Sequence, residues 1–301
     1  MYAMLVTTSD GAVIVLEDAT LPSQRTGEEL PLVFLHGLSQ QRKYWSPVVS
    51  RMRTGRIVTI DQRAHGQAAD ECVDGASHSD FGMDRLALDV IEALDALSIP
   101  RAIVVGHSWG ASVALHTAAA HPNRVAACTL IDGGLFGPRH VAALIGDHDR
   151  VREALRPPPL GLLAPVLWQA ISTGDLSAYW SPEIKAALEP TFRVDEMGRA
   201  FTRIGMERHM AVLDGLFAYD PAPDVSTLTC PAWAVICEPR AGWDPQDPLG
   251  EAWSQARQES IRGLPETFFL QRWSGALHDV PLQWPDLVAG LLATVVERTD
   301  A

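Results

Sequence analysis

The chain has 301 residues, an apolar share of 47% and a formal net charge of −13 at pH 7. This length accommodates one large α/β domain or two small ones, with a substantial core. The acidic charge argues against a nucleic-acid partner, because surfaces that bind phosphates are basic.

The chain lacks the patterns of a targeting or membrane segment. Residues 1–16 have no basic stretch, and no apolar run approaches the ~20 residues of a membrane helix. Neither metal-ligand nor small-domain disulfide spacing is found among the four cysteines, which are Cys72, Cys128, Cys230 and Cys237. We therefore expect a cytoplasmic protein without metal or cofactor. Its partner would be a small-molecule substrate, not a membrane, and assembly into homo-oligomers is left open.

Short apolar strands alternate with helical patterns over the first part of the chain. A hairpin is predicted first, followed by strands and helices in turn. The predicted strands are 3–7, 12–16, 32–35, 56–60, 103–105 and 125–131, and the predicted helices are 45–52, 84–97 and 111–120. This alternation predicts an α/β fold, with a mostly parallel, doubly wound sheet between two layers of helices.

The alternation pauses after Gly134. From about residue 135 to 225 the chain shows helical pieces broken by prolines, and then strands 231–237 and 267–270 and a helix over 285–296 follow. We expect residues 135–225 to form a helical cap over the carboxyl ends of the strands, where such sheets bind ligands. Residues 1–134 and 226–301 would form the core domain.

The most specific motif is Gly106-His107-Ser108-Trp109-Gly110, between an apolar strand and an alanine-rich helix. This context predicts a nucleophile elbow, a tight turn that exposes the serine hydroxyl above a parallel sheet. The glycines allow neighbouring backbone to approach the turn. The helix directs its N-terminal amides towards the place where negative charge would develop in acyl transfer.

Four motifs in order resemble the α/β-hydrolase fold superfamily, in its capped serine-hydrolase branch. They are His36-Gly37, Asp61-Gln62-Arg63-Ala64-His65-Gly66, the elbow at Ser108, and Gly275-Ala276-Leu277-His278. The second motif departs slightly, because the family usually has glycine where Ala64 stands. The resemblance covers nearly the whole chain and implies this fold.

The resemblance also implies roles for individual residues. His278 stands where the family places its catalytic histidine, the base that a serine hydroxyl needs. The oxyanion hole would consist of the backbone amides of Leu38 and Trp109. His36 would line the loop beside the site.

The third member of the triad is ambiguous. Arg240 stands where relatives most often carry an aspartate, and an arginine cannot stabilise an imidazolium. Asp132 follows the strand after the elbow strand, at a position that a minority of the family uses. Glu238 lies about two residues early, and Asp244 could reach back from a longer loop. We favour Asp132 and keep Glu238 and Asp244 as alternatives.

Large apolar residues in the predicted cap suggest a medium-sized, largely apolar substrate. Trp168 and Trp180 in the cap, together with Trp45 and His36, are the predicted substrate-binding residues.

The elbow also resembles that of haloalkane dehalogenases and epoxide hydrolases, which carry aspartate where this chain has Ser108. With serine, the alkylated intermediate of those enzymes would be an ether, which water does not readily cleave. We therefore expect a serine hydrolase acting on an ester, lactone or related acyl bond. The alternative is a non-hydrolytic or ligand-binding member with a degraded triad, whether a lyase, cyclase or perhydrolase or a protein that only binds.

Overall fold

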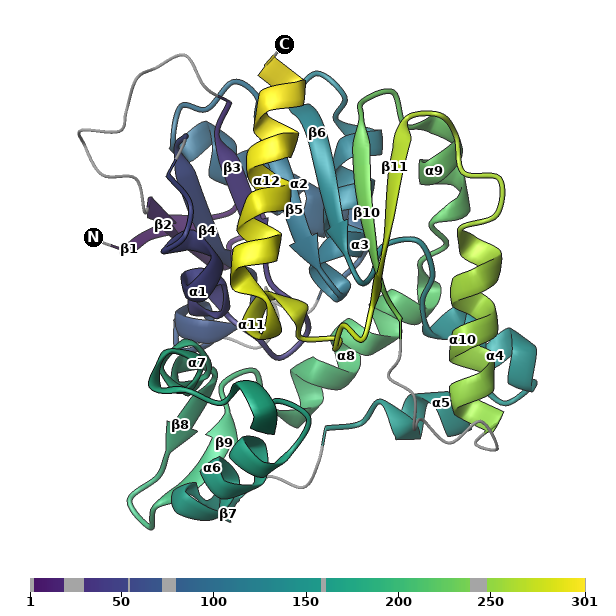
Figure 1. The fold of residues 1–301 in the computed structure, drawn as a ribbon. Helices are drawn as coiled ribbons and strands as arrows, with labels where there is room; N and C mark the ends of the chain where they lie inside the picture. Colours follow the sequence, from purple (N-terminus) through teal and green to yellow (C-terminus); the bar gives the residue numbers. More distant parts are fainter. Residues whose placement is uncertain are drawn as a thin grey trace.

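A computed structural model describes residues 3–18, 30–53, 55–71, 80–157, 161–238 and 248–300. Its centre is an eight-stranded sheet of order β1-β2-β4-β3-β5-β6-β10-β11 (Figure 1). Only β1 and β2 run antiparallel to their neighbours, and the other pairs are parallel. The strands are β1 (Ala3–Thr7), β2 (Val13–Asp18), β3 (Leu32–Leu35), β4 (Ile57–Asp61), β5 (Ala102–His107), β6 (Val125–Ile131), β10 (Ala232–Glu238) and β11 (Phe268–Ser274). The predicted α/β fold with a mostly parallel sheet is confirmed.

Helices cover both faces of this sheet (Figure 1). One apolar layer contains α2 (Met83–Ala96) and α3 (Trp109–Ala120), and the other contains α12 (Pro285–Asp300). The short helices η2 (Arg42–Trp45), α1 (Ser46–Val49) and α11 (Val280–Gln283) pack with α12. Within β5, Val104 packs in the first layer and Ile103 and Val105 in the second. Successive side chains of a strand point to opposite faces, so a strand buried on both faces is apolar throughout.

The predicted cap segment is more mixed than the sequence suggests. Its helices are α4 (Pro138–Ile145), α5 (His148–Ala154), α6 (Ala164–Thr173), η4 (Ser177–Tyr179), α7 (Pro182–Leu188), η5 (Glu189–Thr191), α8 (Gly205–Ala218) and α9 (Ala222–Thr227). Between them lies a small antiparallel sheet of order β7-β9-β8, formed by β7 (Leu162–Leu163), β8 (Phe192–Val194) and β9 (Arg199–Thr202). Asp195 Oδ1 closes its hairpin by accepting hydrogen bonds from the amides of Met197 and Arg199. Such short strands are easily overlooked among proline-broken helices.

The boundaries of the predicted cap remain a prediction. Helix α9 packs against α3, so the last residues of the segment lie on the core. Further elements that the sequence does not predict include η3 (Gly66–Ala69), α10 (Pro248–Ser260) and α11. Within the described ranges, no helix is both long enough and apolar enough to cross a membrane.

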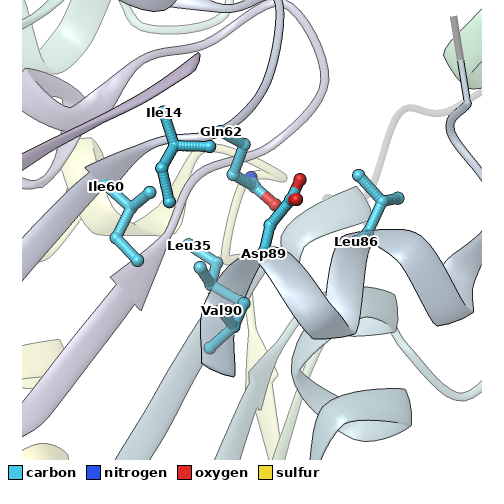
Figure 2. Close-up of a pocket in the computed structure, with 7 residues that line it drawn as sticks. All are labelled: Ile14, Leu35, Ile60, Gln62, Leu86, Asp89 and Val90. Atoms are coloured by element: carbon cyan, nitrogen blue, oxygen red, sulfur yellow. The ribbon is translucent and has the colours of Figure 1, made fainter. Parts of the chain in front are cut away.

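A buried ion pair joins the loop after β4 to helix α2. Arg63 has no exposed side-chain surface, and its Nε and Nη2 atoms donate to both oxygens of Asp89 at 2.6 and 2.7 Å. Arg63 Nη1 also donates to Asp10 at 2.9 Å. Figure 2 shows Asp89 beside Gln62 at a void of about 10 Å³, among aliphatic side chains of the strands and of α2. Arg85 also donates to Asp89, at 2.9 Å, so removal of Arg63 would leave the buried carboxylate with only this one counter-ion.

We therefore expect Arg63→Ala to lower the free energy of unfolding by about 3 kcal/mol, the lower end of the range for a broken buried ion pair, because Asp89 loses its buried partner and keeps only Arg85. Urea unfolding followed by circular dichroism measures this loss. Arg101→Ala, which removes the same charge from an exposed position, should change stability by no more than about 0.5 kcal/mol. Equal losses in the two variants would contradict this role of the ion pair.

Candidate active site

The turn after β5 exposes Ser108 at the carboxyl edge of the sheet. Ser108 has φ 54° and ψ −121°, a strained conformation for a residue with a side chain. Its amide donates to the carbonyl of Ile131 at 2.9 Å, and α3 begins at the next residue. A Cβ on Gly106 would clash with the backbone of Gly110, so only glycine fits there.

Asp132 reaches the same edge from β6. His107 is paired with Ile131 in the parallel register, so the residues that follow, Ser108 and Asp132, lie side by side. Asp132 also has a positive φ, 46°, and its amide donates to the carbonyl of Val235 at 2.9 Å. One carboxylate oxygen, Oδ1, accepts a hydrogen bond from the amide of Cys237 at 3.0 Å. The other oxygen is free to meet a further donor.

That donor is His278, in the turn between β11 and α11. His278 Nδ1 lies 2.7 Å from Asp132 Oδ2, and Nε2 lies 2.9 Å from Ser108 Oγ. A carboxylate can only accept, so Nδ1 carries the proton and Nε2 is left to accept from the serine hydroxyl. The three residues form a continuous hydrogen-bonded chain of the Ser–His–Asp type.

In the hydrogen-bonded chain of Ser108, His278 and Asp132, the acid and the base each favour the charged form of the other. Burial works to raise the pKa of Asp132, but His278, the charge of Arg257 and the Cys237 amide outweigh it and hold that pKa below its ordinary value. Burial works to lower the pKa of His278, but the hydrogen bond and charge of Asp132 raise it above the usual 6.5. The His278 side chain keeps 56% of its surface exposed, because it faces the cavity described below. The site thus combines an ionised acid with a strengthened base.

The loop that carries His278 is fixed from behind by buried groups. Burial lowers the pKa of His107 to about 4, so its ring is neutral at pH 7, and its Nε2 donates to the carbonyl of His278 at 2.8 Å. Tyr44 Oη donates to Asp279 at 2.9 Å, and the Leu277 amide donates to Gln283 at 2.6 Å. His107 and Tyr44 are therefore positioning residues.

Of the two alternative acids, the structure describes only Glu238, which has another partner. Glu238 accepts from Arg272 Nε at 2.6 Å, on the partly exposed surface at the ends of β10 and β11. Asp244 and Arg240 lie outside the described residues. Among the described candidates, only Asp132 meets His278.

The two predicted oxyanion donors flank Ser108. The Trp109 amide opens α3, where the first amides of a helix lack intrahelical acceptors. The end of β3 approaches the elbow closely, since a Cβ on Gly37 would lie 3.2 Å from Ser108 Cβ. Leu38, the next residue, lines the same cavity as Ser108 and Trp109. In the described chain, neither the Leu38 nor the Trp109 amide donates to another backbone group.

A cavity of about 1100 Å³ lies above Ser108 and His278, between the sheet edge and the cap segment. It is large enough for a medium-sized ligand. Most of the side chains that line it are apolar, and they include Leu38, Phe136, Leu155, Leu162, Leu167, Ile171, Leu188, Phe192, Leu213, Leu216, Trp253 and Leu277. Among the polar lining residues are Gln40, Thr191, Thr202, His209 and Arg257.

The four residues predicted to bind substrate do not line this cavity. His36 and Trp45 are fully buried. His36 accepts from the Gln62 amide and donates to the Gly37 carbonyl, and Trp45 packs on Phe34. Trp168 and Trp180 pack on each other and on the second apolar layer. The structure corrects the prediction: these rings stabilise the core and cap, and His36 supports the turn that carries Leu38.

Sequence reasoning missed the wall formed by α10. Trp253 and Arg257 stand four residues apart on this helix, so they share one face, and both line the cavity with Phe136. The four-residue spacing can be read from the sequence, but the sequence does not show which face of α10 lines the cavity. Within the described residues, no group of three His, Cys, Asp or Glu side chains is arranged to hold a metal ion.

Comparisons with known proteins agree with this architecture. A family model described as alpha/beta hydrolase fold matches residues 31–176. A protein named as a non-heme haloperoxidase of Mycobacterium phage D29 is 35% identical over 138 residues, which are 45% of this chain and 48% of the relative. The sn-1-specific diacylglycerol lipase ABHD11 of Danio rerio is 34% identical over 109 residues, 35% of this chain and 32% of the relative.

The chain thus matches less than half the length of these curated relatives. A solved structure is similar over almost the whole chain. The peroxisomal alpha-beta-hydrolase Lpx1 of Saccharomyces cerevisiae superposes with a TM-score of 0.73 at 16% identity, over 99% of this chain and 84% of that chain. The sheet order, the matched family model and this superposition show that the chain has the α/β-hydrolase fold.

Proposed function

We propose that this protein is a serine hydrolase that cleaves an ester, lactone or related acyl bond of a medium-sized small molecule. The observation that carries the proposal is the hydrogen-bonded chain from Ser108 through His278 to Asp132, on the floor of a cavity of about 1100 Å³. A nucleophile, a base that faces it and an acid that orients the base are the requirements of acyl transfer.

In the acylation step, His278 Nε2 takes the proton of Ser108 Oγ while that oxygen attacks the acyl carbonyl carbon. The carbonyl oxygen becomes an oxyanion, which the amides of Leu38 and Trp109 stabilise by hydrogen bonds. The imidazolium then gives its proton to the leaving oxygen, and the acyl group remains on Ser108.

In the deacylation step, water replaces the leaving group. His278 takes a proton from this water, which attacks the acyl carbon, and then returns the proton to Ser108 Oγ. Asp132 stays ionised throughout, holds the ring in the required tautomer and stabilises the imidazolium. The positioning contacts of His107 and Tyr44 keep the ring in register with both partners.

The motive for the alternative, a non-hydrolytic or binding protein with a degraded triad, is Arg240, which stands where relatives most often carry the acid. The hydrogen bond between Asp132 and His278 removes that motive, because the base has an acid from another strand. The apolar lining of the cavity supports a substrate with a substantial hydrocarbon part.

A serine-directed phosphonate should add once to the wild-type protein and not at all to Ser108→Ala, because the base beside Ser108 is oriented by a carboxylate. Ser39 also contacts a histidine, His209, but the other ring nitrogen of that histidine is bound by the Leu155 carbonyl and not by an acid. The intact mass of the protein after incubation measures the adduct. Ser172→Ala, which removes an exposed hydroxyl outside the cavity lining, should be labelled like wild type. Labelling of folded Ser108→Ala would refute the nucleophile.

The three candidate acids should differ sharply in their effect on turnover. Once an ester substrate is found, we expect Asp132→Asn to lower kcat by about 10³ to 10⁴, as for other triad aspartates. Glu238→Gln and Asp244→Asn should each change kcat less than about threefold, an energy of about 0.5 kcal/mol, because His278 has its acid in Asp132. Steady-state kinetics of the purified variants gives the ranking. Any other order would mean that Asp132 is not the acid of the triad.

The pKa of His278 should fall in Asp132→Asn. The carboxylate raises that pKa in the wild type, so its loss leaves burial and the charge of Arg257, which favour the neutral ring, opposed only by the charge of Asp279. An NMR titration of the ring resonances measures the shift, with His278→Gln to assign them. Glu238→Gln serves as the control that should not move the titration, and an unmoved titration in Asp132→Asn would mean that the hydrogen bond does not form in solution.

A further inference from the structure

Arg257 is a cationic group in the cavity for which the proposed mechanism has no use. It stands on α10 and lines the cavity with Ser108, Asp132 and His278. Its positive charge works to lower the pKa of both Asp132 and His278, so the guanidinium lies within electrostatic range of the reacting atoms.

Besides Arg257, the carboxylate and guanidinium side chains that line the cavity are Asp132, Arg156, Asp175 and Asp279. Asp132 is bound by His278 and by the Cys237 amide, and Asp279 accepts from Tyr44. Arg156, another cation at the cavity wall, pairs with Glu153. In the part of the chain that the structure describes, no carboxylate forms an ion pair with Arg257, and its Nε is buried without a hydrogen-bond acceptor. A buried donor without an acceptor is costly, and the guanidinium that carries it belongs to a side chain that lines the cavity.

The Phe136 ring, which itself packs on Trp253, holds the guanidinium in place. Its central carbon lies 5.7 Å from the centre of the Phe136 ring, and Trp253 meets the same ring edge to face at 5.9 Å. Stacking on an aromatic face restricts the planar group but uses none of its N–H donors. The donors therefore stay available to a ligand in the cavity.

We propose that Arg257 binds a carboxylate of the substrate, so that the natural substrate is an acyl compound with a free carboxylate some distance from the bond that is cleaved. A single unpaired guanidinium with an apolar surround matches one planar anion of charge −1, which it can bind through two parallel hydrogen bonds. Phosphate, with a higher charge, would leave negative charge uncompensated beside Asp132. This proposal rests on the proposed function for the bond that is cleaved, but the binding of the anion can be tested without it.

The test uses calorimetric titration of Ser108→Ala, which binds substrates without turning them over. The probes are the monomethyl esters of succinate, adipate and suberate, each compared with its dimethyl ester. We expect at least one monoester to bind about 10- to 100-fold more tightly than its diester, the range of a hydrogen bond to a charged group. In Ser108→Ala/Arg257→Gln this preference should fall below about threefold, which is less than the weakest bond in that range.

Two matched variants sharpen the result. Ser108→Ala/Arg262→Gln removes the same charge from an exposed position shortly after α10 and should keep the preference. Arg257→Lys in the same background should keep part of it, because the charge remains and the planar fork is lost. No preference in Ser108→Ala, or a preference that survives Arg257→Gln, would overturn the proposal, as would inorganic phosphate binding as tightly as the best monoester.

Failure of the proposed function would look different. In one outcome, the wild-type protein binds the monoester through Arg257 but neither hydrolyses it nor reacts with the phosphonate. This result would support the anion site and refute the hydrolase assignment. In the other outcome, the protein reacts with the phosphonate but shows no preference for the monoester. This result would support the hydrolase assignment and refute the anion site.

Discussion

Backbone crowding where β5 and β6 end is the constraint on which the site depends. Ser108 and Asp132 both hold positive φ angles, at a cost of about 1–3 kcal/mol each. A Cβ on Gly133 would fall on the backbone of Ser108, and one on Gly110 would meet the carbonyls that end β3. Three strand ends are therefore in direct backbone contact. This contact brings the nucleophile, the acid and the Leu38 amide to one edge, and the ladder hydrogen bonds of the buried sheet offset its cost.

The parts of this arrangement that depend on local sequence could be predicted. The strands Leu32–Leu35 and Val125–Ile131 have the predicted bounds, because a buried parallel strand is apolar along its whole length and ends at a glycine or a polar residue. Asp132 could be favoured because it follows such a strand. Whether it reaches His278 depends on the register of β6 between β5 and β10, which no local pattern contains.

Residue type alone could not separate side chains that line the cavity from those that fill the core. Trp45 and Trp253 are both tryptophans near the strand ends, yet the first is fully buried between Phe34 and His107 and the second faces the cavity. The position of His36 after β3 predicts a place beside the pocket, but its ring hydrogen-bonds the backbone of Gly37 and Gln62. Which side of a loop or helix faces the cavity is decided by packing between elements far apart in the chain.

The same packing couples recognition to chemistry. Arg257 disfavours the imidazolium of His278 by charge repulsion, and acylation requires that imidazolium. In the proposed complex, the substrate carboxylate neutralises Arg257 and removes this repulsion at the moment when His278 takes the proton of Ser108. An otherwise similar neutral substrate would leave the guanidinium unpaired, so it would lose the binding contact and meet a weaker base. One arginine on a helix without local catalytic motifs can thus select the substrate twice, once in binding and once in proton transfer.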